Sequence, residues 1–247
     1  MKEAMIDTTN PDPYFFNCLF ENYSDILKKK AERLKTEKGK ELLSLDKWYQ
    51  EELPALIQIR SKKHITHPEL CKLMTWKLTR GKFRPRLTQL VQTNSEAVVT
   101  ETSQRAFKQM PDLKSAIKSL SELKAVGPAT ASAVLAAGCP NKSAFMADEA
   151  MQCFPDLQPL QYTLNFYLQY MQNIDRVSKT LNKYDSGNAW TPHKVEIALW
   201  TWRTSKILGT EISQNGKIDT CPKDLEIEEM DEERTEKAKR LSRKRKR

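Results

Sequence analysis

Apolar side chains recur at helical spacing along most of this 247-residue chain, and that spacing restricts the folds open to it. The helix predicted over about 160–181 has one apolar face, formed by Leu164, Tyr167, Leu168, Met171, Ile174 and Val177. Helix-start signals also recur, and the capping box Thr66-His67-Pro68-Glu69 is the clearest of them. No stretch of useful length alternates apolar and polar residues in the manner of a strand. The sequence therefore predicts an all-α protein.

The helical patterns fall within one predicted domain, residues 11–209. Further helices are expected over about 12–30, from Ser44 onward with a kink at Pro54, over about 66–81, 86–92, 95–108, 112–123 and 128–137, and from Thr191 to Gly209. Residues 1–10 are a polar leader that we expect to be flexible. From about residue 210 the periodicity is lost, and we expect residues 210–247 to form a disordered tail.

The predicted tail has two parts of opposite charge. An acidic stretch over 224–236 precedes the basic end Lys-Arg-Leu-Ser-Arg-Lys-Arg-Lys-Arg at 239–247. A terminal basic run of this density resembles a nuclear-localisation signal, so we expect the nuclear import machinery to bind it and the protein to reside in the nucleus. Direct contact of the same run with phosphate is the alternative.

The composition limits the classes of partner and cofactor. A formal net charge of +9 favours an anionic partner, with nucleic acid ahead of an acidic membrane surface or an acidic protein. The five cysteines are scattered without a CxxC pair, and no signal-peptide pattern is present, which indicates reduced thiols in an intracellular protein. No apolar run approaches the roughly 18 residues that span a membrane. His64 and His67 lack a third ligand nearby, so no metal site is expected.

A basic turn is predicted between the helices over 66–81 and 86–92. Five cations fall within ten residues there, without an intervening acid: Lys77, Arg80, Lys82, Arg84 and Arg86. In a chain of net positive charge, this turn is either a solvated basic surface or a set of phosphate contacts. The sequence alone favours neither alternative.

A second break lies between the helices predicted over 112–123 and 128–137. The segment Leu-Lys-Ala-Val-Gly-Pro at 123–128 joins them by a tight turn whose backbone N–H groups are positioned to meet a phosphate. The stretch from 120 to 135 resembles a helix-hairpin-helix motif, whose usual core is Leu-Pro-Gly-hydrophobic-Gly-x-x-Thr-Ala. The matching residues are Leu123, Val126, Gly127, Thr130 and Ala131, whereas Lys124 and Ala125 stand where Pro and the first Gly are usual.

The residues after this motif extend the resemblance. A Gly/Pro loop at Gly138 and Pro140 leads through a hydrophobic segment to Asp148, an order and spacing similar to those of the helix-hairpin-helix, Gly/Pro, Asp superfamily of base-excision DNA glycosylases. The resemblance covers about 120–151 and implies an all-α, DNA-glycosylase-like fold. It implies that Asp148 stabilises an oxocarbenium-like sugar or activates water after the target base is flipped out of the duplex.

The resemblance also implies a set of DNA contacts. The backbone N–H groups of Ala125, Val126 and Gly127 would bind a phosphate, in some members through a monovalent cation, and Thr130 would cap the second helix. Lys124, beside the turn, joins the cations of the basic turn as a candidate contact with double-stranded DNA.

Departures from the family pattern narrow the expected chemistry. Ala129 occupies the position of the nucleophilic lysine of bifunctional members, so a lyase step is not expected. Asp148-Glu149-Ala150 lacks the usual Thr and His after the Asp. Cys221 stands alone where some members carry four cysteines, so no iron–sulfur cluster or other cofactor is expected.

Two functional hypotheses follow for a monomeric nuclear protein. The first is a monofunctional DNA glycosylase, in which water attacks the sugar C1′ and Asp148 supplies the key carboxylate. The second is a non-enzymatic DNA-binding or protein-interaction scaffold that retains the fold. Asp148 is equally suited to be the N-cap of a helix beginning at Glu149. Gly127-Pro128 could also form a plain helix–helix turn, but the following Thr130-Ala131 favours the DNA-binding hairpin.

Overall fold

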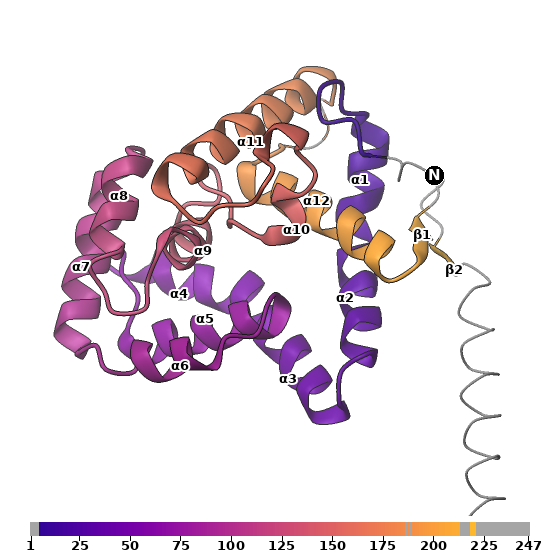
Figure 1. The fold of residues 1–247 in the computed structure, drawn as a ribbon. Coiled ribbons are helices and arrows are strands. Elements are labelled where there is room, and N and C mark those ends of the chain that lie inside the picture. Colours follow the sequence, from indigo (N-terminus) through magenta and orange to yellow (C-terminus); the bar gives the residue numbers. More distant parts are fainter. Residues whose placement is uncertain (1–4, 186, 188, 213–217, 221–247) are drawn as a thin grey trace, which may run out of the picture.

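The structure, a computed structural model, describes residues 5–185, 187, 189–212 and 218–220, and these are almost wholly helical, as predicted (Figure 1). The α-helices are α1 (Pro13–Glu21), α2 (Tyr23–Glu32), α3 (Thr36–Lys47), α4 (Leu53–Ile59), α5 (His67–Arg80), α6 (Pro85–Val91), α7 (Glu96–Gln109), α8 (Leu113–Leu120), α9 (Pro128–Gly138), α10 (Asp148–Met151), α11 (Leu164–Tyr184) and α12 (Pro192–Ile207). A π-helical turn (Trp48–Glu52) joins α3 to α4, and a 3₁₀ turn (Pro155–Leu157) follows α10.

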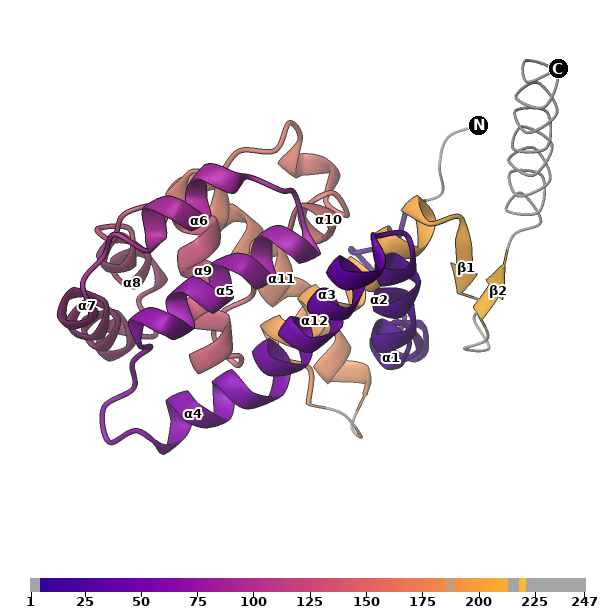
Figure 2. The same ribbon diagram turned by 90° about the horizontal axis from the view of Figure 1, so that it is seen from below.

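The helices form two groups, and the chain passes from the first to the second and back. In the first group, α1 and α2 pack against α12, so the two ends of the helical chain lie together (Figures 1 and 2). In the second group, α4 and α5 pack against α9, and α7 packs against α8. The α3–α4 segment runs from the first group to the second, whereas α11 and α12 return to the first. Helices from the middle of the sequence therefore contact helices from its end, as α10 contacts α12 and α9 contacts α11.

Helix α9 lies at the centre of the second group. All of its residues from Thr130 to Gly138 are buried, as expected for a helix that is apolar on every side. The Tyr49 hydroxyl donates a hydrogen bond of 2.9 Å to the Ala133 carbonyl and so ties the π-helical turn to this helix. Its last residue, Gly138, is packed so closely that a Cβ there would lie 2.3 Å from the ring of Phe107. Close packing along the whole of α9 therefore fixes the position of its first turn.

The predicted helix boundaries hold where capping signals are strong. Helix α5 begins with the Thr66/Glu69 capping box, and α12 begins with Thr191 as its N-cap. The helix expected from Ser44 instead begins at Thr36. Gly39, a poor helix former, weakens the pattern there, yet the structure requires it, because a Cβ at this position would lie 2.5 Å from the Ala31 carbonyl oxygen.

The kink expected at Pro54 takes the form of the π-helical turn over Trp48–Glu52. Proline has no N–H to donate to the carbonyl four residues earlier, so the regular α-helical ladder is interrupted just before it. Helix α4 then begins at Leu53, with the proline in its first turn, where a missing donor costs nothing.

Two expectations for the chain ends are corrected within the described residues. Strands β1 (Thr210–Ile212) and β2 (Ile218–Thr220) pair in antiparallel register, so the loss of regular structure expected from residue 210 is wrong for these segments. Strands of three residues are too short to show a period. The leader is not free over residues 5–10, because Ile6 is buried in the core. Residues 1–4, 213–217 and 221–247, with both charged parts of the tail, lie outside the described residues.

None of the helices described is both long and apolar enough to cross a bilayer.

Candidate functional site

A pocket of about 230 Å³ opens where the two helix groups meet. Its walls are the last turn of α5 with the turn that follows, the start of α9, and the segment leading into α10. The lining residues are Lys77, Arg80, Gly81, Lys82, Arg84, Leu87, Ala125, Gly127, Pro128, Ala129, Thr130, Phe145, Met146, Ala147, Asp148, Glu149 and Tyr162. Three separate sequence predictions, the basic turn, the turn before α9 and Asp148, therefore converge on one pocket.

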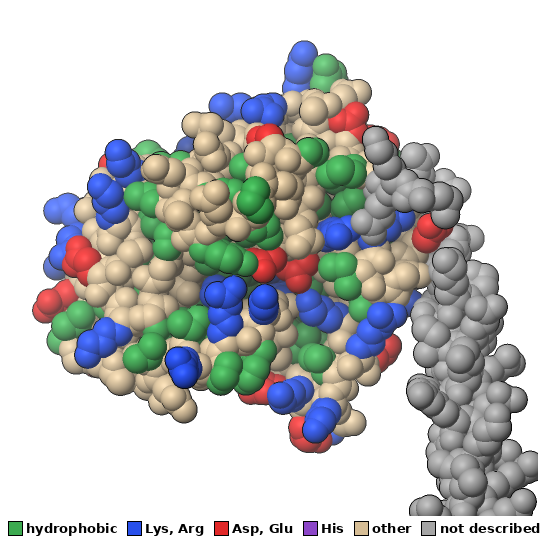
Figure 3. All heavy atoms as spheres, in the orientation of Figure 1, with side chains coloured by type: hydrophobic (Ala, Val, Ile, Leu, Met, Phe, Trp, Pro, Cys, Tyr) green, Lys and Arg blue, Asp and Glu red, His purple; other side chains and the backbone are tan. Residues whose placement is uncertain are grey.

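Charges of both signs meet at this place on the surface. Figure 3 shows Lys and Arg side chains beside Asp and Glu side chains near the middle of the face on which α10 and the α5–α6 turn lie in Figure 1. Lys82 and Arg84 are exposed, while Asp148 and Glu149 are half-buried. The pocket thus has a basic rim and an acidic wall.

The turn between α8 and α9 is held by one backbone hydrogen bond and by one side chain. The Val126 N–H donates to the Leu123 carbonyl at 3.1 Å, so the prediction that this N–H binds a phosphate is wrong. Ala125 has a φ of 65°, the left-handed conformation that glycine adopts most readily, and it stands where the helix-hairpin-helix pattern has its first Gly. Asn94 clamps the preceding residue, since its Oδ1 accepts from the Lys124 N–H at 2.9 Å and its Nδ2 donates to the Lys124 carbonyl at 3.1 Å. Asn94 belongs to a distant loop, and no sequence signal indicated this role.

Helix α9 begins at this turn without a side-chain cap. Its N-cap is Gly127, and no side chain in the described chain accepts from the first N–H groups of the helix. The prediction that Thr130 caps the helix is wrong, because this residue lies inside the first turn and is buried. A Cβ on Gly127 would meet nothing within 4 Å, so the fold itself leaves the start of α9 open to the pocket.

Asp148 directs its carboxylate into the pocket. The N-cap of α10 is Ala147, so Asp148 is the first residue of the helix and not its cap. The Tyr162 hydroxyl donates a hydrogen bond of 2.8 Å to Asp148 Oδ2. Burial and the negative charge of Asp148 raise the pKa of Tyr162 to about 12, so the phenol stays protonated and remains a donor. The sequence left open whether Asp148 is the N-cap of this helix, and the structure shows that it is not.

Tyr162 itself was not found from the sequence. It lies 14 residues after Asp148 in an extended segment before α11, with no motif around it. The residue is 38% exposed and lines the pocket, and the Arg84 guanidinium lies 5.2 Å from the centroid of its ring. The basic turn and the carboxylate are therefore joined through this tyrosine.

The six predicted cations differ in how far solvent reaches them. Lys82 and Arg84 are exposed at the rim of the pocket, and Lys124 and Arg86 are exposed outside its lining. Lys77 is half-buried within the pocket, where burial and the nearby charge of Arg84 lower its pKa to about 8 against the opposing effect of Asp148.

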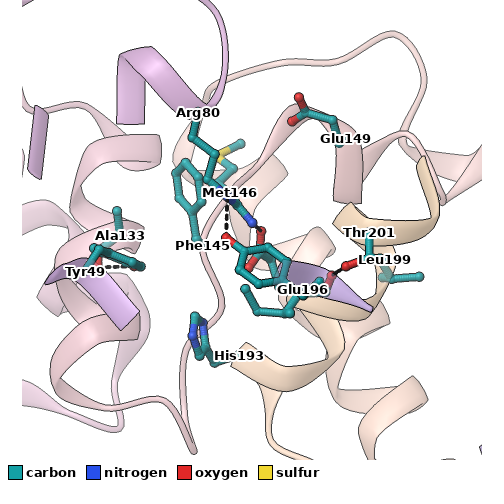
Figure 4. A network of polar contacts seen from close by, with 12 residues as sticks. Tyr49, Arg80, Ala133, Phe145, Met146, Glu149, His193, Glu196, Leu199 and Thr201 are labelled. Atoms are coloured by element: carbon teal, nitrogen blue, oxygen red, sulfur yellow. Dashed lines mark hydrogen bonds and ion pairs between the residues drawn. The ribbon is translucent and has the colours of Figure 1, made fainter. Parts of the chain in front are cut away.

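Arg80 is a buried structural residue. Its side chain is 1% exposed, and its Nη1 and Nη2 atoms lie 3.1 Å and 3.2 Å from Glu196 Oε1 on α12 (Figure 4). The guanidinium also lies 4.4 Å from the ring centroid of Trp200. The prediction that Arg80 contacts phosphate is therefore wrong, because the last turn of α5 faces the first helix group on this side.

The buried ion pair belongs to a polar network beneath the pocket. The Tyr23 hydroxyl accepts from Arg80 Nε at 3.2 Å and donates to Asp46 Oδ1 at 2.8 Å, and Trp76 Nε1 donates to the same carboxylate oxygen at 2.8 Å. This network ties α2 and α3 to α5. The helix that carries Lys77 is therefore rigidly placed.

Glu149, the second acidic residue of the pocket wall, has a partner of its own. Its Oε1 atom lies 3.3 Å from Lys30 Nζ on α2, and both side chains are largely buried. Asp148 is thus the carboxylate of the pocket that faces no cation at ion-pair distance among the described residues. In the same residues, no group of three or more His, Cys, Asp or Glu side chains is arranged to hold a metal ion.

Comparisons of the chain with protein-family models, with curated proteins and with solved structures find no match.

Proposed function

We propose that the protein binds DNA at this pocket and acts there as a monofunctional glycosylase that hydrolyses an N-glycosidic bond. One observation supports the proposal above all others: the Asp148 carboxylate, the uncapped start of α9 and two exposed cations line a single pocket. These are the groups that a sugar–phosphate substrate requires, a counter-charge for developing positive charge on the sugar and donors for the phosphates.

The phosphate contacts follow from the start of α9. The first N–H groups of a helix lack intrahelical partners, and the helix dipole favours an anion beside them. Gly127 keeps the approach open, and Lys82 and Arg84 stand at the rim where neighbouring phosphates of a duplex would lie. In this proposal Lys124 and Arg86 lie farther out on the same footprint.

The chemistry assigned to Asp148 is electrostatic. As the N-glycosidic bond breaks, positive charge develops on the sugar, and a fixed carboxylate nearby stabilises it while water attacks C1′. The hydrogen bond from Tyr162 holds the carboxylate in place without neutralising it. The target base would have to leave the duplex at a cost of a few kcal/mol, recovered by contacts in the pocket.

A binding protein without catalysis is the second candidate. Glu149 is paired with Lys30, so the pocket offers a single carboxylate without a second acid or base of its kind beside it. That arrangement supports a domain that binds phosphate at this surface and does not catalyse base release. The nuclear location and the import machinery as a partner rest on the basic run at 239–247 and remain proposals from the sequence.

Binding is tested first, by the salt dependence of duplex affinity. Each phosphate contact contributes about 0.9 to the slope of log affinity against log salt concentration, so Lys82→Ala/Arg84→Ala should flatten the slope by about 2. The matched control is Lys28→Ala/Lys40→Ala, which removes two exposed lysines outside the pocket. An equal change in both double variants would remove the basic rim from the footprint.

Catalysis is tested next, by base release from a panel of duplexes with damaged or mismatched bases. Loss of the carboxylate in Asp148→Asn should lower the rate by about 10²–10³ while duplex affinity is retained. Duplex binding without base release by the unaltered protein, across the whole panel, would establish the binding protein instead.

A further inference from the structure

We propose that the acidic stretch of this chain, residues 224–236, docks on the basic rim of the pocket, formed by Lys82 and Arg84, and that duplex DNA must displace it in order to bind. The inference rests on the proposed function and adds a regulation of the same site. The docking itself is a contact within the protein, so it can be measured without DNA.

The cations of the basic rim lack the acidic partners that other exposed cations of the domain have. Lys28 Nζ, for example, lies 3.0 Å from Asp25 Oδ1. Among the described residues, no carboxylate lies within 4.0 Å of Lys82 Nζ or of the Arg84 guanidinium. The basic rim therefore presents positive charge that no described side chain pairs.

The acidic stretch has the charge to pair it. Of its thirteen residues, eight are Asp or Glu and one is Arg. A single exposed ion pair contributes only about 0.2–1 kcal/mol and is weakened by salt, so a stable contact requires several pairs made together. A segment with this density of carboxylates can make them, as the successive phosphates of a duplex would.

Apolar side chains accompany the charges on both surfaces. Beside the pocket, Phe83 is 66% exposed and Leu90 on α6 is 49% exposed. The acidic stretch carries Leu225, Ile227 and Met230 between its acids. Covering exposed apolar surface contributes about 25 cal/mol for each Å², which adds to the ion pairs and is not screened by salt. The two surfaces are therefore complementary in polarity as well as in charge.

The chain is long enough to bring the acidic stretch to the pocket. Strand β2 ends at Thr220, and the ten residues that lead from there to Met230 span at most about 35 Å. A domain of about 200 residues has a radius of about 20 Å. In Figures 1 and 2, α10 and the α5–α6 turn lie between β2 and the far helix α7. The pocket therefore lies within reach of the middle of the acidic stretch.

A second basic groove fits the acidic stretch less well. Its cations are Lys62, Lys63, Arg105 and Lys108, on α7 and in the loop that precedes α5. Figures 1 and 2 place α7 at the opposite side of the molecule from β2. Arg105 is also paired with Glu122. This groove is farther from Thr220 and partly neutralised, so its exposed Lys108 is a suitable reference for Lys82.

Zero-length cross-linking tests the docking in the full chain without DNA. A water-soluble carbodiimide joins a carboxylate to an amine in contact with it, and peptide mass spectrometry identifies the pair. We expect links from residues 224–236 to Lys82 at least ten times more often than to Lys108, which is also exposed. The yield should not change on dilution, as a contact within one chain requires. Links confined to the lysines of 237–246, or equal links to Lys82 and Lys108, would overturn the docking.

Duplex affinity tests the competition. Five acids of the stretch are converted to amides in Glu228→Gln/Glu229→Gln/Asp231→Asn/Glu232→Gln/Glu233→Gln. This variant should bind a duplex about tenfold more tightly than the unaltered protein at about 50 mM salt. The difference should disappear at about 0.5 M salt, where the docking contacts are screened.

The matched control makes the same change in net charge elsewhere. Five exposed glutamates outside the pocket are converted to Gln, and this should raise duplex affinity less than threefold; they are Glu21, Glu41, Glu51, Glu52 and Glu101. In a Lys82→Ala/Arg84→Ala background, the substitutions in the acidic stretch should also change duplex affinity less than threefold, because their target is gone.

The two measurements separate failure of this inference from failure of the proposed function. Duplex binding by the unaltered protein without a link at Lys82 would overturn the docking and leave the proposed function standing. Equal duplex affinities of the acidic-stretch variant and the control would overturn the competition. Absence of duplex binding in all of these proteins would remove the proposed function and the competition with it, and a link at Lys82 would then establish the docking alone.

Discussion

The Tyr162 hydroxyl donates a hydrogen bond of 2.8 Å to the carboxylate of Asp148 across the pocket. The bond orients the carboxylate toward the pocket, and Ala147, not Asp148, occupies the N-cap position of α10. A carboxylate held in this way is preorganised, so it needs no rearrangement when positive charge develops beside it.

Tyr162→Phe should lower the rate of base release about tenfold, since a hydrogen bond to a charged group contributes about 1.5–3 kcal/mol and about 1.4 kcal/mol corresponds to tenfold. Duplex affinity should change less than twofold. Tyr184→Phe, at an exposed tyrosine outside the pocket, is the control and should leave both quantities unchanged. An unaltered rate in Tyr162→Phe would show that the hydrogen bond does not position the carboxylate.

Gly127→Ala should weaken duplex binding about tenfold and lower the free energy of unfolding by less than about 1 kcal/mol. The added Cβ meets nothing in the protein, so its effect falls on a ligand that approaches the start of α9. Gly138→Ala should instead lower the free energy of unfolding by about 1–3 kcal/mol and leave the duplex affinity of the folded protein unchanged. The reason is that its Cβ would lie 2.3 Å from the Phe107 ring. Equal duplex affinity of Gly127→Ala and the unaltered protein would exclude a backbone–phosphate contact at this turn.

Glu196→Gln should lower the free energy of unfolding, measured in urea, by about 3–5 kcal/mol, because it leaves the buried charge of Arg80 uncompensated. The double variant Arg80→Met/Glu196→Met should lose less, since both charges are removed together. Its salt slope for duplex binding should equal that of the unaltered protein. A flatter salt slope in the double variant would show that Arg80 does contact phosphate.

Acid should destabilise the protein through His193. Its Nε2 atom lies 2.8 Å from Gln50 Oε1, its Nδ1 is buried without a partner in the described part of the chain, and burial together with the charge of Arg80 lowers its pKa from 6.5 to about 4. The unfolded chain therefore binds this proton more readily between about pH 6.5 and pH 4, and the free energy of unfolding falls as the pH is lowered through that range.

His193→Gln removes this titration. Relative to the variant, the unaltered protein should lose about 2 kcal/mol of unfolding free energy between about pH 7 and pH 5, as measured by urea unfolding at each pH. Parallel pH dependence of the two proteins would show that His193 is solvated and titrates normally.

Local signals predicted those parts of the fold that local physics controls. The capping box at Thr66 and the cap at Thr191 placed the starts of α5 and α12 correctly, because a cap acts within one helical turn. The start of α3 was missed, because Gly39 is a poor helix former whose value lies in the close approach of α3 to Ala31 on α2. A contact between two helices leaves no periodic trace in the sequence of either one.

The sequence by itself determined the helical class, the basic turn, the turn at Gly127 and the presence of Asp148 after a Gly/Pro loop. Only the tertiary structure decided how these side chains are used. It directed Arg80 into the core toward Glu196, gave the Asp148 carboxylate a hydrogen bond from the Tyr162 hydroxyl at the wall of a pocket, and placed Lys77 in the lining of the same pocket. The physical reason is that burial, ion pairing and pKa depend on through-space neighbours, and these come from helices far apart in the chain.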